Sequence, residues 1–148
     1  MTHHVNLTVT IAQPVEPVFG FVSDPLRFPL WNSAVESVER TSGSTYAMHR
    51  RLPTGPAVNE LEVVALEPPT AFGIRTISGP TPFTYRYRFV PEGSATVIAL
   101  DGEVELGGIA AAVAPLALRA IKRGIAANLA TLKRILETRE FAPDETER

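Results

Sequence analysis

Aromatic and arginine side chains alternate between residues 83 and 90. Successive side chains of a strand point to opposite faces, so Tyr85 and Tyr87 share an aromatic face while the arginines share the opposite one. We expect the aromatic face to line the interior and the arginines to meet solvent. A tyrosine hydroxyl in an apolar cavity can orient a ligand or polarise its carbonyl group, and core packing is the alternative role. Tyr85, Tyr87 and Tyr46 are therefore the candidate polar groups for ligand binding.

Carboxylates two positions apart offer a second kind of chemistry. If Leu52 pairs with Val58 across a hairpin, Glu60 and Glu62 share a face with Arg50. Facing inward, a carboxylate of raised pKa and an arginine would form an acid/base and oxyanion-stabilising pair. Facing outward, they would form cross-strand ion pairs worth less than about 1 kcal/mol. The apolar pattern leaves the direction open, so the catalytic residues stay unassigned, with Glu62, Tyr85 and Arg50 as candidates.

The histidines form a poor pattern for metal binding. His3 and His4 are adjacent in a predicted strand and point to opposite faces, and His49 precedes Arg50 and Arg51, which indicates a solvated position. The absence of cysteine excludes disulfides, Cys-ligated zinc, iron–sulfur clusters and thiol catalysis. The sequence also lacks G-x-S-x-G, P-loop and G-x-G-x-x-G motifs. We therefore expect no metal and no cofactor.

The elements that must position these residues are mostly strands. Residues 5–11 alternate between apolar and polar side chains, which predicts a strand, and the spacing of apolar residues predicts short helices over 14–23 and 26–31. Turn residues then divide the chain into six strand-like segments, which indicates an antiparallel meander. These segments are Val35–Thr41, Thr45–Leu52, Val58–Glu67, Phe72–Ser78, Phe83–Val90 and Ala95–Leu106.

The last third of the chain changes period and predicts one long amphipathic helix from Pro115 to Arg139. Its apolar stripe consists of Leu118, Ile121, Ile125, Leu129, Leu132 and Leu136. The fold class is therefore α+β, a curved seven-stranded antiparallel sheet around a long C-terminal helix, with two short helices after the first strand. Because one helical stripe is narrower than such a sheet, we expect an apolar space between them, and such a space is a ligand site by default.

Composition limits the classes of partner. The 148 residues include 14 Lys+Arg and 16 Asp+Glu, a net charge of −2, which disfavours a nucleic-acid partner. The small apolar run 107–118 is too short to cross a bilayer, and no signal-peptide pattern is present, so we expect a cytoplasmic protein without an integral membrane segment.

We expect one domain over 1–141 and a flexible tail over 142–148. A homodimer is left open.

Several short motifs follow one another in a distinctive order. They are Pro14–Pro25 (PVEPVFGFVSDP), Trp31, Val35…Val38-Glu39, Glu67-Pro68, Thr96-Val97 and Leu132-Lys133…Leu136-Glu137. Together they resemble the START-like or SRPBCC superfamily, which includes polyketide cyclase/dehydrase-like proteins. The resemblance covers nearly the whole chain and implies a helix-grip fold with a tryptophan, here Trp31, at the end of the cavity. It is specific for the fold and not for an activity, because the superfamily includes carriers, receptors and cyclases.

The leading hypothesis is a carrier or sensor that binds a small lipid-, polyketide- or aromatic-like molecule between sheet and helix. Phe28 and Trp31 are a candidate gate. The stripe residues Leu118, Ile121, Ile125 and Leu129 supply the opposite wall. The alternative is a polyketide cyclase/dehydratase-type enzyme that uses the same pocket. A third hypothesis, a protein-interaction module, expects no cavity and an exposed apolar patch.

Overall fold

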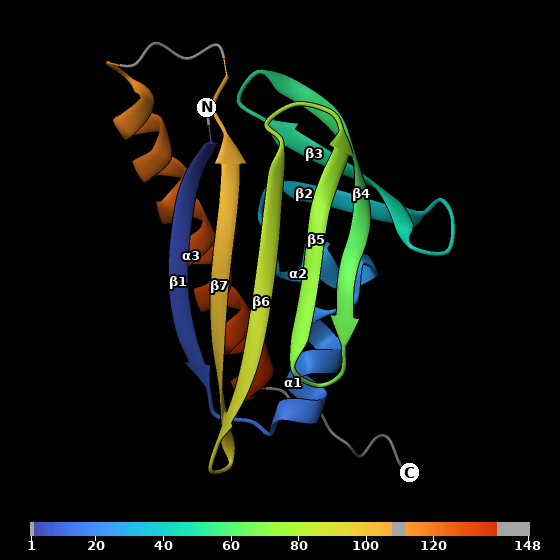
Figure 1. Ribbon diagram of the computed structural model, residues 1–148, viewed down its shortest axis with the longest axis vertical. Coiled ribbons are helices and arrows are strands. Elements are labelled where there is room, and N and C mark those ends of the chain that lie inside the picture. The colour runs from blue at the N-terminus through green and yellow to red at the C-terminus, as the bar shows by residue number, and fades with distance from the viewer. Residues whose placement is uncertain (1, 108–111, 139–148) are drawn as a thin grey trace.

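Within residues 2–107 and 112–138, the part of the chain that the computed structural model describes, seven strands form one antiparallel sheet. The strands are β1 (Thr2–Ile11), β2 (Val35–Arg40), β3 (Thr45–Leu52), β4 (Gly55–Glu67), β5 (Ala71–Ser78), β6 (Phe83–Glu92) and β7 (Ala95–Glu105). Their order across the sheet is β1-β7-β6-β5-β4-β3-β2. Each strand from β2 to β6 therefore pairs with its successor, and β1 completes the sheet beside β7, which confirms the predicted meander (Figure 1).

The helices lie on one side of this sheet (Figure 1). They are α1 (Val15–Val22), the 3-10 turn η1 (Pro25–Arg27), α2 (Phe28–Trp31) and α3 (Ala114–Thr138). The Asp24 carboxylate starts η1 by accepting a hydrogen bond of 3.0 Å from the Leu26 amide. The Asn32 amide ends α2 by donating a bond of 2.8 Å to the Phe28 carbonyl. The predicted short helix over 26–31 is thus a 3-10 turn followed by a single α-helical turn.

The hairpin between β3 and β4 closes more tightly than expected. Leu52 pairs with Gly55, not with Val58, so Pro53 and Thr54 alone form the turn. Gly55 adopts a φ of 123°, a backbone angle that residues with a side chain rarely reach, and this allows the early closure. The register therefore shifts by an odd number of residues relative to the expected pairing, which exchanges the two faces of β4.

Helix α3 is fastened to the sheet at its C-terminal half. Leu132 and Leu136 are completely buried there. The Ala12 amide donates a hydrogen bond of 2.7 Å to the Glu137 carboxylate, and the Lys133 ammonium donates one of 2.6 Å to the Thr10 carbonyl. These contacts fix the C-terminal half of α3 to the end of β1.

The N-terminal half of α3 is less closely packed. Leu118 and Ile121 are only half-buried, and Leu116 is 64% exposed. The stripe predicted from the sequence is therefore fully buried only toward its C-terminal end. The predicted helix end at Arg139 and the predicted tail over 142–148 lie outside the described residues. Among the helices of residues 2–107 and 112–138, none is long and apolar enough to cross a membrane.

Truncating the anchored half of α3 tests this packing. We expect Leu132→Ala to lower the free energy of unfolding by about 2–5 kcal/mol, because it leaves a cavity at a completely buried site. The matched variant Leu116→Ala removes the same atoms from an exposed site of α3 and should change it by less than about 0.5 kcal/mol. Urea unfolding of both variants measures the difference, and equal losses would contradict the packing described.

Candidate functional site

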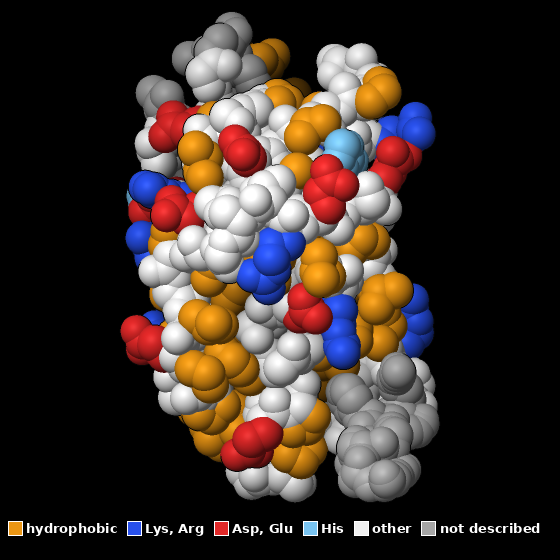
Figure 2. Space-filling model, turned by 90° about the vertical axis from the view of Figure 1, so that its right-hand side faces the viewer, with side chains coloured by type: hydrophobic (Ala, Val, Ile, Leu, Met, Phe, Trp, Pro, Cys, Tyr) orange, Lys and Arg blue, Asp and Glu red, His pale blue; other side chains and the backbone are white. Residues whose placement is uncertain are grey.

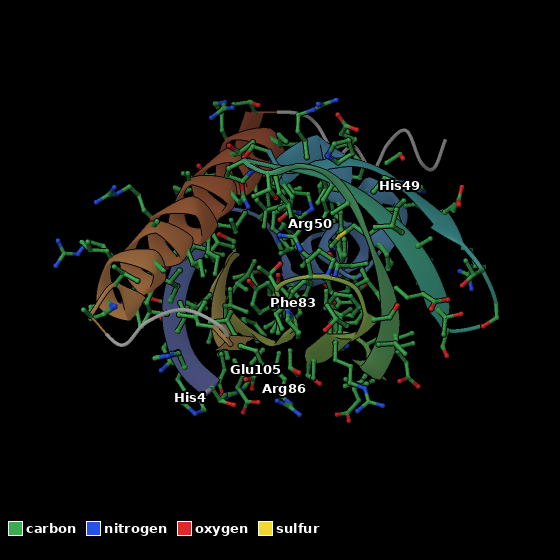
Figure 3. All side chains as sticks on the ribbon, turned by 90° about the horizontal axis from the view of Figure 1, so that it is seen from above. His4, His49, Arg50, Phe83, Arg86 and Glu105 are labelled. Carbon is green, nitrogen blue, oxygen red and sulfur yellow. The ribbon has the colours of Figure 1, made fainter. Side chains whose placement is uncertain are left out.

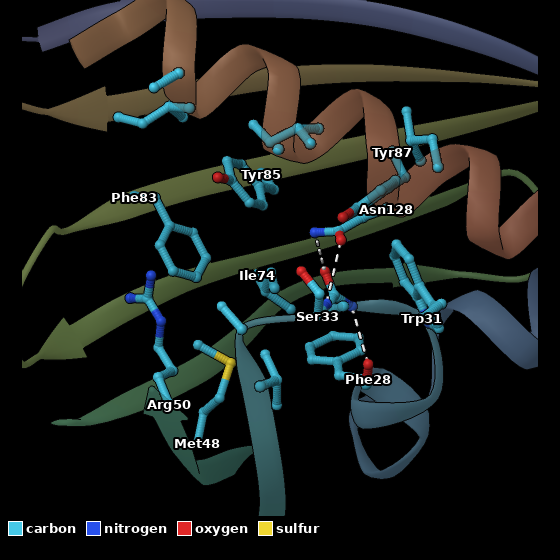
Figure 4. A pocket seen from close by; sticks show the side chains of 18 of the residues that line it. Phe28, Trp31, Ser33, Met48, Arg50, Ile74, Phe83, Tyr85, Tyr87 and Asn128 are labelled. Carbon is cyan, nitrogen blue, oxygen red and sulfur yellow. Dashed lines mark hydrogen bonds between the residues drawn. The ribbon is translucent and has the colours of Figure 1, made fainter. Parts of the chain in front are cut away.

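A pocket of about 370 Å³ lies between the inner face of the sheet and α3 (Figure 4). Aromatic and aliphatic side chains form most of its wall, and Arg50 is its one charged side chain among the described residues. Its lining comprises Phe28, Trp31, Asn32, Ser33, Ala34, Val35, Met48, Arg50, Pro53, Ile74, Phe83, Tyr85, Tyr87, Ala120, Ile121, Gly124, Ile125, Asn128 and Leu129. Its exposed lining residues, which solvent reaches, are Ser33, Pro53, Ala120 and Gly124.

Aromatic rings pack around the inner end of the pocket. Trp31 meets Phe28 edge-on at a centroid distance of 5.9 Å and Tyr87 at 6.5 Å. Tyr87 in turn stacks on Phe72 at 5.8 Å. These pairs hold the rings in the edge-on and stacked geometries that aromatic quadrupoles favour. Trp31 is 3% exposed, and its indole Nε1 has no hydrogen-bond partner among the described residues.

Arg50 extends from β3 toward the other end of the pocket (Figure 4). Its Nη1 donates a hydrogen bond of 2.7 Å to Asn59 Oδ1 and one of 3.1 Å to Thr81 Oγ1. Both partners are neutral, so the guanidinium is held in place without a carboxylate. Burial lowers the pKa of Arg50 from its ordinary value.

Asn59 connects this arginine to the loop between β5 and β6. Its side chain is completely buried, and Nδ2 donates to the Ser78 carbonyl at 3.2 Å and to the Pro80 carbonyl at 2.9 Å. Gly79 adopts a φ of 105°, and a Cβ there would lie 2.5 Å from the side-chain nitrogen Nδ2 of Asn59. Only glycine therefore lets the loop close over Asn59.

Tyr85 lies at the same end of the pocket as Arg50 (Figure 4). Its ring stacks on Phe83 at a centroid distance of 4.4 Å. Burial raises the pKa of Tyr85 to about 12, against a smaller opposing effect of the Arg50 charge. Burial also raises the pKa of Tyr87, and the neighbouring Tyr85 adds to that shift. Both phenols therefore keep their protons at neutral pH and can donate hydrogen bonds.

An asparagine pair joins α2 to α3 beside the pocket. Asn128 Nδ2 donates to Asn32 Oδ1 at 3.2 Å, and the Ser33 amide donates to Asn128 Oδ1 at 3.2 Å. Asn32 Nδ2 donates in turn to the Phe28 carbonyl at 3.2 Å. The amide oxygens of both asparagines are therefore occupied within the protein, and α2 is held against α3.

The structure brings most of the residues predicted for ligand binding into the lining of one pocket. Those that line the pocket are Phe28, Trp31, Tyr85, Tyr87, Ile121, Ile125 and Leu129, and Arg50 joins them from the catalytic candidates. Tyr46 and Leu118 are not in its lining. Tyr46 is 5% exposed, and the Arg40 guanidinium covers its ring at 5.0 Å. Leu118 packs on the edge of the core.

The expectation that Glu60 and Glu62 share a face with Arg50 is wrong. In the observed register Glu60 lies opposite Ala47, and Arg50 lies opposite Ala57, because the hairpin closes at Gly55. Glu60 is exposed, and Glu62 makes an ion pair of 2.9 Å with Arg75. The side of the molecule that lies on the right in Figure 1 mixes acidic, basic and hydrophobic side chains (Figure 2).

The view into the curved sheet separates inner from outer side chains (Figure 3). Arg50 and Phe83 point into the space between sheet and helices, whereas His4, His49 and Arg86 lie outside it. His49 contacts the Glu39 carboxylate at 3.5 Å. Residues 2–107 and 112–138 contain no group of three or more His, Asp or Glu side chains placed to hold a metal ion.

Sequence reasoning missed the asparagines in and around the pocket. Asn128 lies one position before the predicted stripe residue Leu129, and its place near the stripe was a usable signal. Asn59 carried no such signal, because its burial depends on the register of β4.

Comparison with known proteins places this geometry in a family. The sequence model of the family described as polyketide cyclase/dehydrase and lipid transport matches residues 2–137. No curated protein sequence matches the chain. A START superfamily protein from Mycobacterium smegmatis is similar in structure, with a TM-score of 0.75 and 21% identity over 91% of this chain and 97% of that one.

Two further solved structures share the fold. The Zhui aromatase/cyclase from Streptomyces sp. R1128 has a TM-score of 0.78 and 16% identity, over 93% of this chain and 94% of that one. A conserved protein from Geobacillus kaustophilus has a TM-score of 0.78 and 18% identity, over 90% and 95% of the two chains. Because that family's sequence model matches residues 2–137, the chain belongs to the polyketide cyclase/dehydrase and lipid transport family.

Proposed function

We propose that the chain binds a small hydrophobic molecule in the pocket between the sheet and α3, as a carrier or sensor. The observation that carries this proposal is the pocket itself, whose volume of about 370 Å³ lies in the range of small-molecule sites. Its wall is mostly aromatic and aliphatic, so apolar burial at roughly 25 cal/mol per Å² would drive binding. A cavity of this kind also favours ligand binding over the protein-interaction hypothesis, which expects none.

The ligand class is a lipid-, polyketide- or aromatic-like molecule. Rings at the inner end, around Trp31 and Tyr87, suit a planar group or an acyl chain equally. The lining side chains also carry polar atoms with no partner among the described residues, namely Trp31 Nε1, Arg50 Nε and Nη2, and the hydroxyls of Ser33, Tyr85 and Tyr87. The indole and the guanidinium can only donate hydrogen bonds, whereas the hydroxyls can donate or accept them. The oxygens of Asn32 and Asn128 are already occupied. The pocket therefore favours ligands whose oxygens accept hydrogen bonds.

A cyclase/dehydratase activity is the second candidate. Arg50 and Tyr85 lie at one end of the pocket, where both can donate to a carbonyl oxygen that gains negative charge. Because burial raises its pKa to about 12, Tyr85 stays protonated at neutral pH, where it can donate a hydrogen bond but cannot accept a proton as a base. The described lining contains no His, Asp or Glu to act as that base. For this reason we place binding before turnover.

Adding a side chain at the pocket lining should reduce ligand binding without reducing the stability of the fold. Gly124 lines the pocket, and a Cβ there would meet no atom within 4 Å, so Gly124→Leu should fill part of the space. Leucine also favours a helix over glycine by roughly 0.5–1 kcal/mol, so stability should not fall. We expect Gly124→Leu to weaken binding of the fluorescent probe N-phenyl-1-naphthylamine at least about tenfold, or roughly 1.4 kcal/mol.

The control for this substitution is Ala126→Leu, at an exposed position of α3 outside the pocket lining. It should leave probe affinity unchanged within about twofold, because it alters the surface without entering the pocket. Fluorescence titration gives the affinities, and thermal unfolding shows that both variants fold. The proposal fails if the wild type takes up no probe, or if Gly124→Leu binds it as well as the control does.

The protonated state of Tyr85 is testable through stability. A tyrosine with a pKa near 12 in the folded chain keeps its proton above pH 10, where the unfolded chain loses it. The folded state then binds more protons, so the free energy of unfolding falls as the pH rises from 10 through 12. Tyr85→Phe should flatten this decline in urea unfolding at pH 9 and pH 11. An identical pH dependence in both proteins would show that Tyr85 ionises as in water.

A further inference from the structure

Arg50 has unused hydrogen-bonding capacity. A guanidinium carries five N–H donors, and the two recorded bonds, to Asn59 and Thr81, both come from Nη1. Nε and Nη2 donate no hydrogen bond to any residue in 2–107 or 112–138. A planar fork of free donors therefore remains on a half-buried side chain in the pocket lining.

The charge of Arg50 is also uncompensated within the described part of the chain. No acidic side chain there lies within ion-pair distance of it, although Arg27, Arg51 and Arg75 all pair with carboxylates on the surface. Its hydrogen-bond partners are an amide and a hydroxyl, and Tyr85 beside it stays neutral. A partly buried cation without a counter-ion is costly unless something else supplies the negative charge.

We propose that the ligand of this pocket is an amphipathic anion, whose single acidic group binds the free edge of Arg50 and whose apolar body extends along the pocket toward Trp31. This inference rests on the proposed function and specifies its ligand class. Carboxylates, sulfonates and phosphate monoesters share the paired oxygens that match the arginine fork. Asn59 and Thr81 hold Nη1 and so orient the remaining donors before a ligand arrives.

The walls beyond Arg50 suit the apolar body of such a ligand. Phe83 and Tyr85 present stacked rings next to the guanidinium, and Ile74 and Trp31 lie further along the pocket (Figure 4). Charge and apolar surface thus lie at opposite ends of one pocket. A neutral molecule of the same shape would fill the apolar part and leave the arginine unpaired. A cation would be repelled.

Two probes with a common aromatic body test the charge preference. 8-Anilinonaphthalene-1-sulfonate carries one sulfonate, and N-phenyl-1-naphthylamine lacks it. The quantity to measure is the ratio of their dissociation constants, neutral over anionic, by fluorescence titration. We expect Arg50→Met to lower this ratio by about tenfold or more, the usual worth of a hydrogen bond to a charged group. Affinity for the neutral probe should change by less than about threefold, because methionine keeps the apolar stem.

Arg51→Met is the matched control. Arg51 is the next residue of β3, pairs with Glu36 at 2.6 Å and lies 67% exposed on the other face. Its substitution changes the net charge equally and should leave the ratio within about twofold of wild type, because an exposed ion pair contributes little. If Arg50→Met does not fold, Arg50→Lys keeps the charge without the fork and should still lower the ratio.

The outcomes separate the two proposals. If the wild type binds neither probe, the proposed function and this inference both fall. If both probes bind and Arg50→Met weakens them equally, Arg50 only supports the loop through Asn59 and Thr81, and the anion preference is refuted. A ratio that falls equally in Arg51→Met would refute it as well, because the effect would then be one of net charge.

Discussion

Helix α3 packs tightly on the sheet along only half of its length, and the pocket depends on this asymmetry. Leu132 and Leu136 are completely buried, and hydrogen bonds from Lys133 and to Glu137 fix that half to the end of β1. Toward its N-terminus the helix presents Ile121 and Gly124 to a space that it does not fill. The sheet supplies the opposite wall, and α2 closes the inner end through the bond between Asn32 and Asn128. A helix buried along its whole length would leave no site.

Hydrogen bonds within the protein hold the polar groups of the pocket in place. Asn59 donates to the Ser78 carbonyl at the end of β5 and to the Pro80 carbonyl in the following loop, and it accepts a bond from Arg50, so one buried amide fixes both a loop and a cation. Burial outweighs the effect of the arginine charge on the pKa of Tyr85, so the phenol beside that cation is an even weaker acid than a free tyrosine. Trp31 Nε1 and the free edge of Arg50 can only donate hydrogen bonds to a ligand, which connects the local hydrogen bonds to the class of molecule that we propose.

Much of this arrangement follows from periodicity. The alternation along β6 correctly separates Tyr87, which is buried, from Arg86, which is exposed. The helical stripe correctly places Ile125 and Leu129 on the buried face of α3 that lines the pocket. Periodicity did not predict which residues of β4 share a face with Arg50. That depends on whether Leu52 pairs with Gly55 or with Val58, because a shift of the strand register by an odd number of residues moves every side chain of β4 to the opposite face of the sheet. Composition around Glu60 and Glu62 is apolar on both parities, so no pattern could compensate for that error. The burial of Asn59 is a consequence of the same turn.

The most direct test of ligand binding in this pocket is to identify any small molecule that is already bound to the purified protein. Native mass spectrometry, followed by denaturation and organic extraction, measures any bound small molecule and its stoichiometry. The account predicts a 1:1 adduct that is lost on denaturation, is largely apolar and carries one acidic group. Repeating the measurement on Gly124→Leu should remove the adduct while the protein stays folded. An adduct of the same occupancy in that variant, or a wild-type chain that stays empty after incubation with long-chain carboxylic acids, would contradict the central claim.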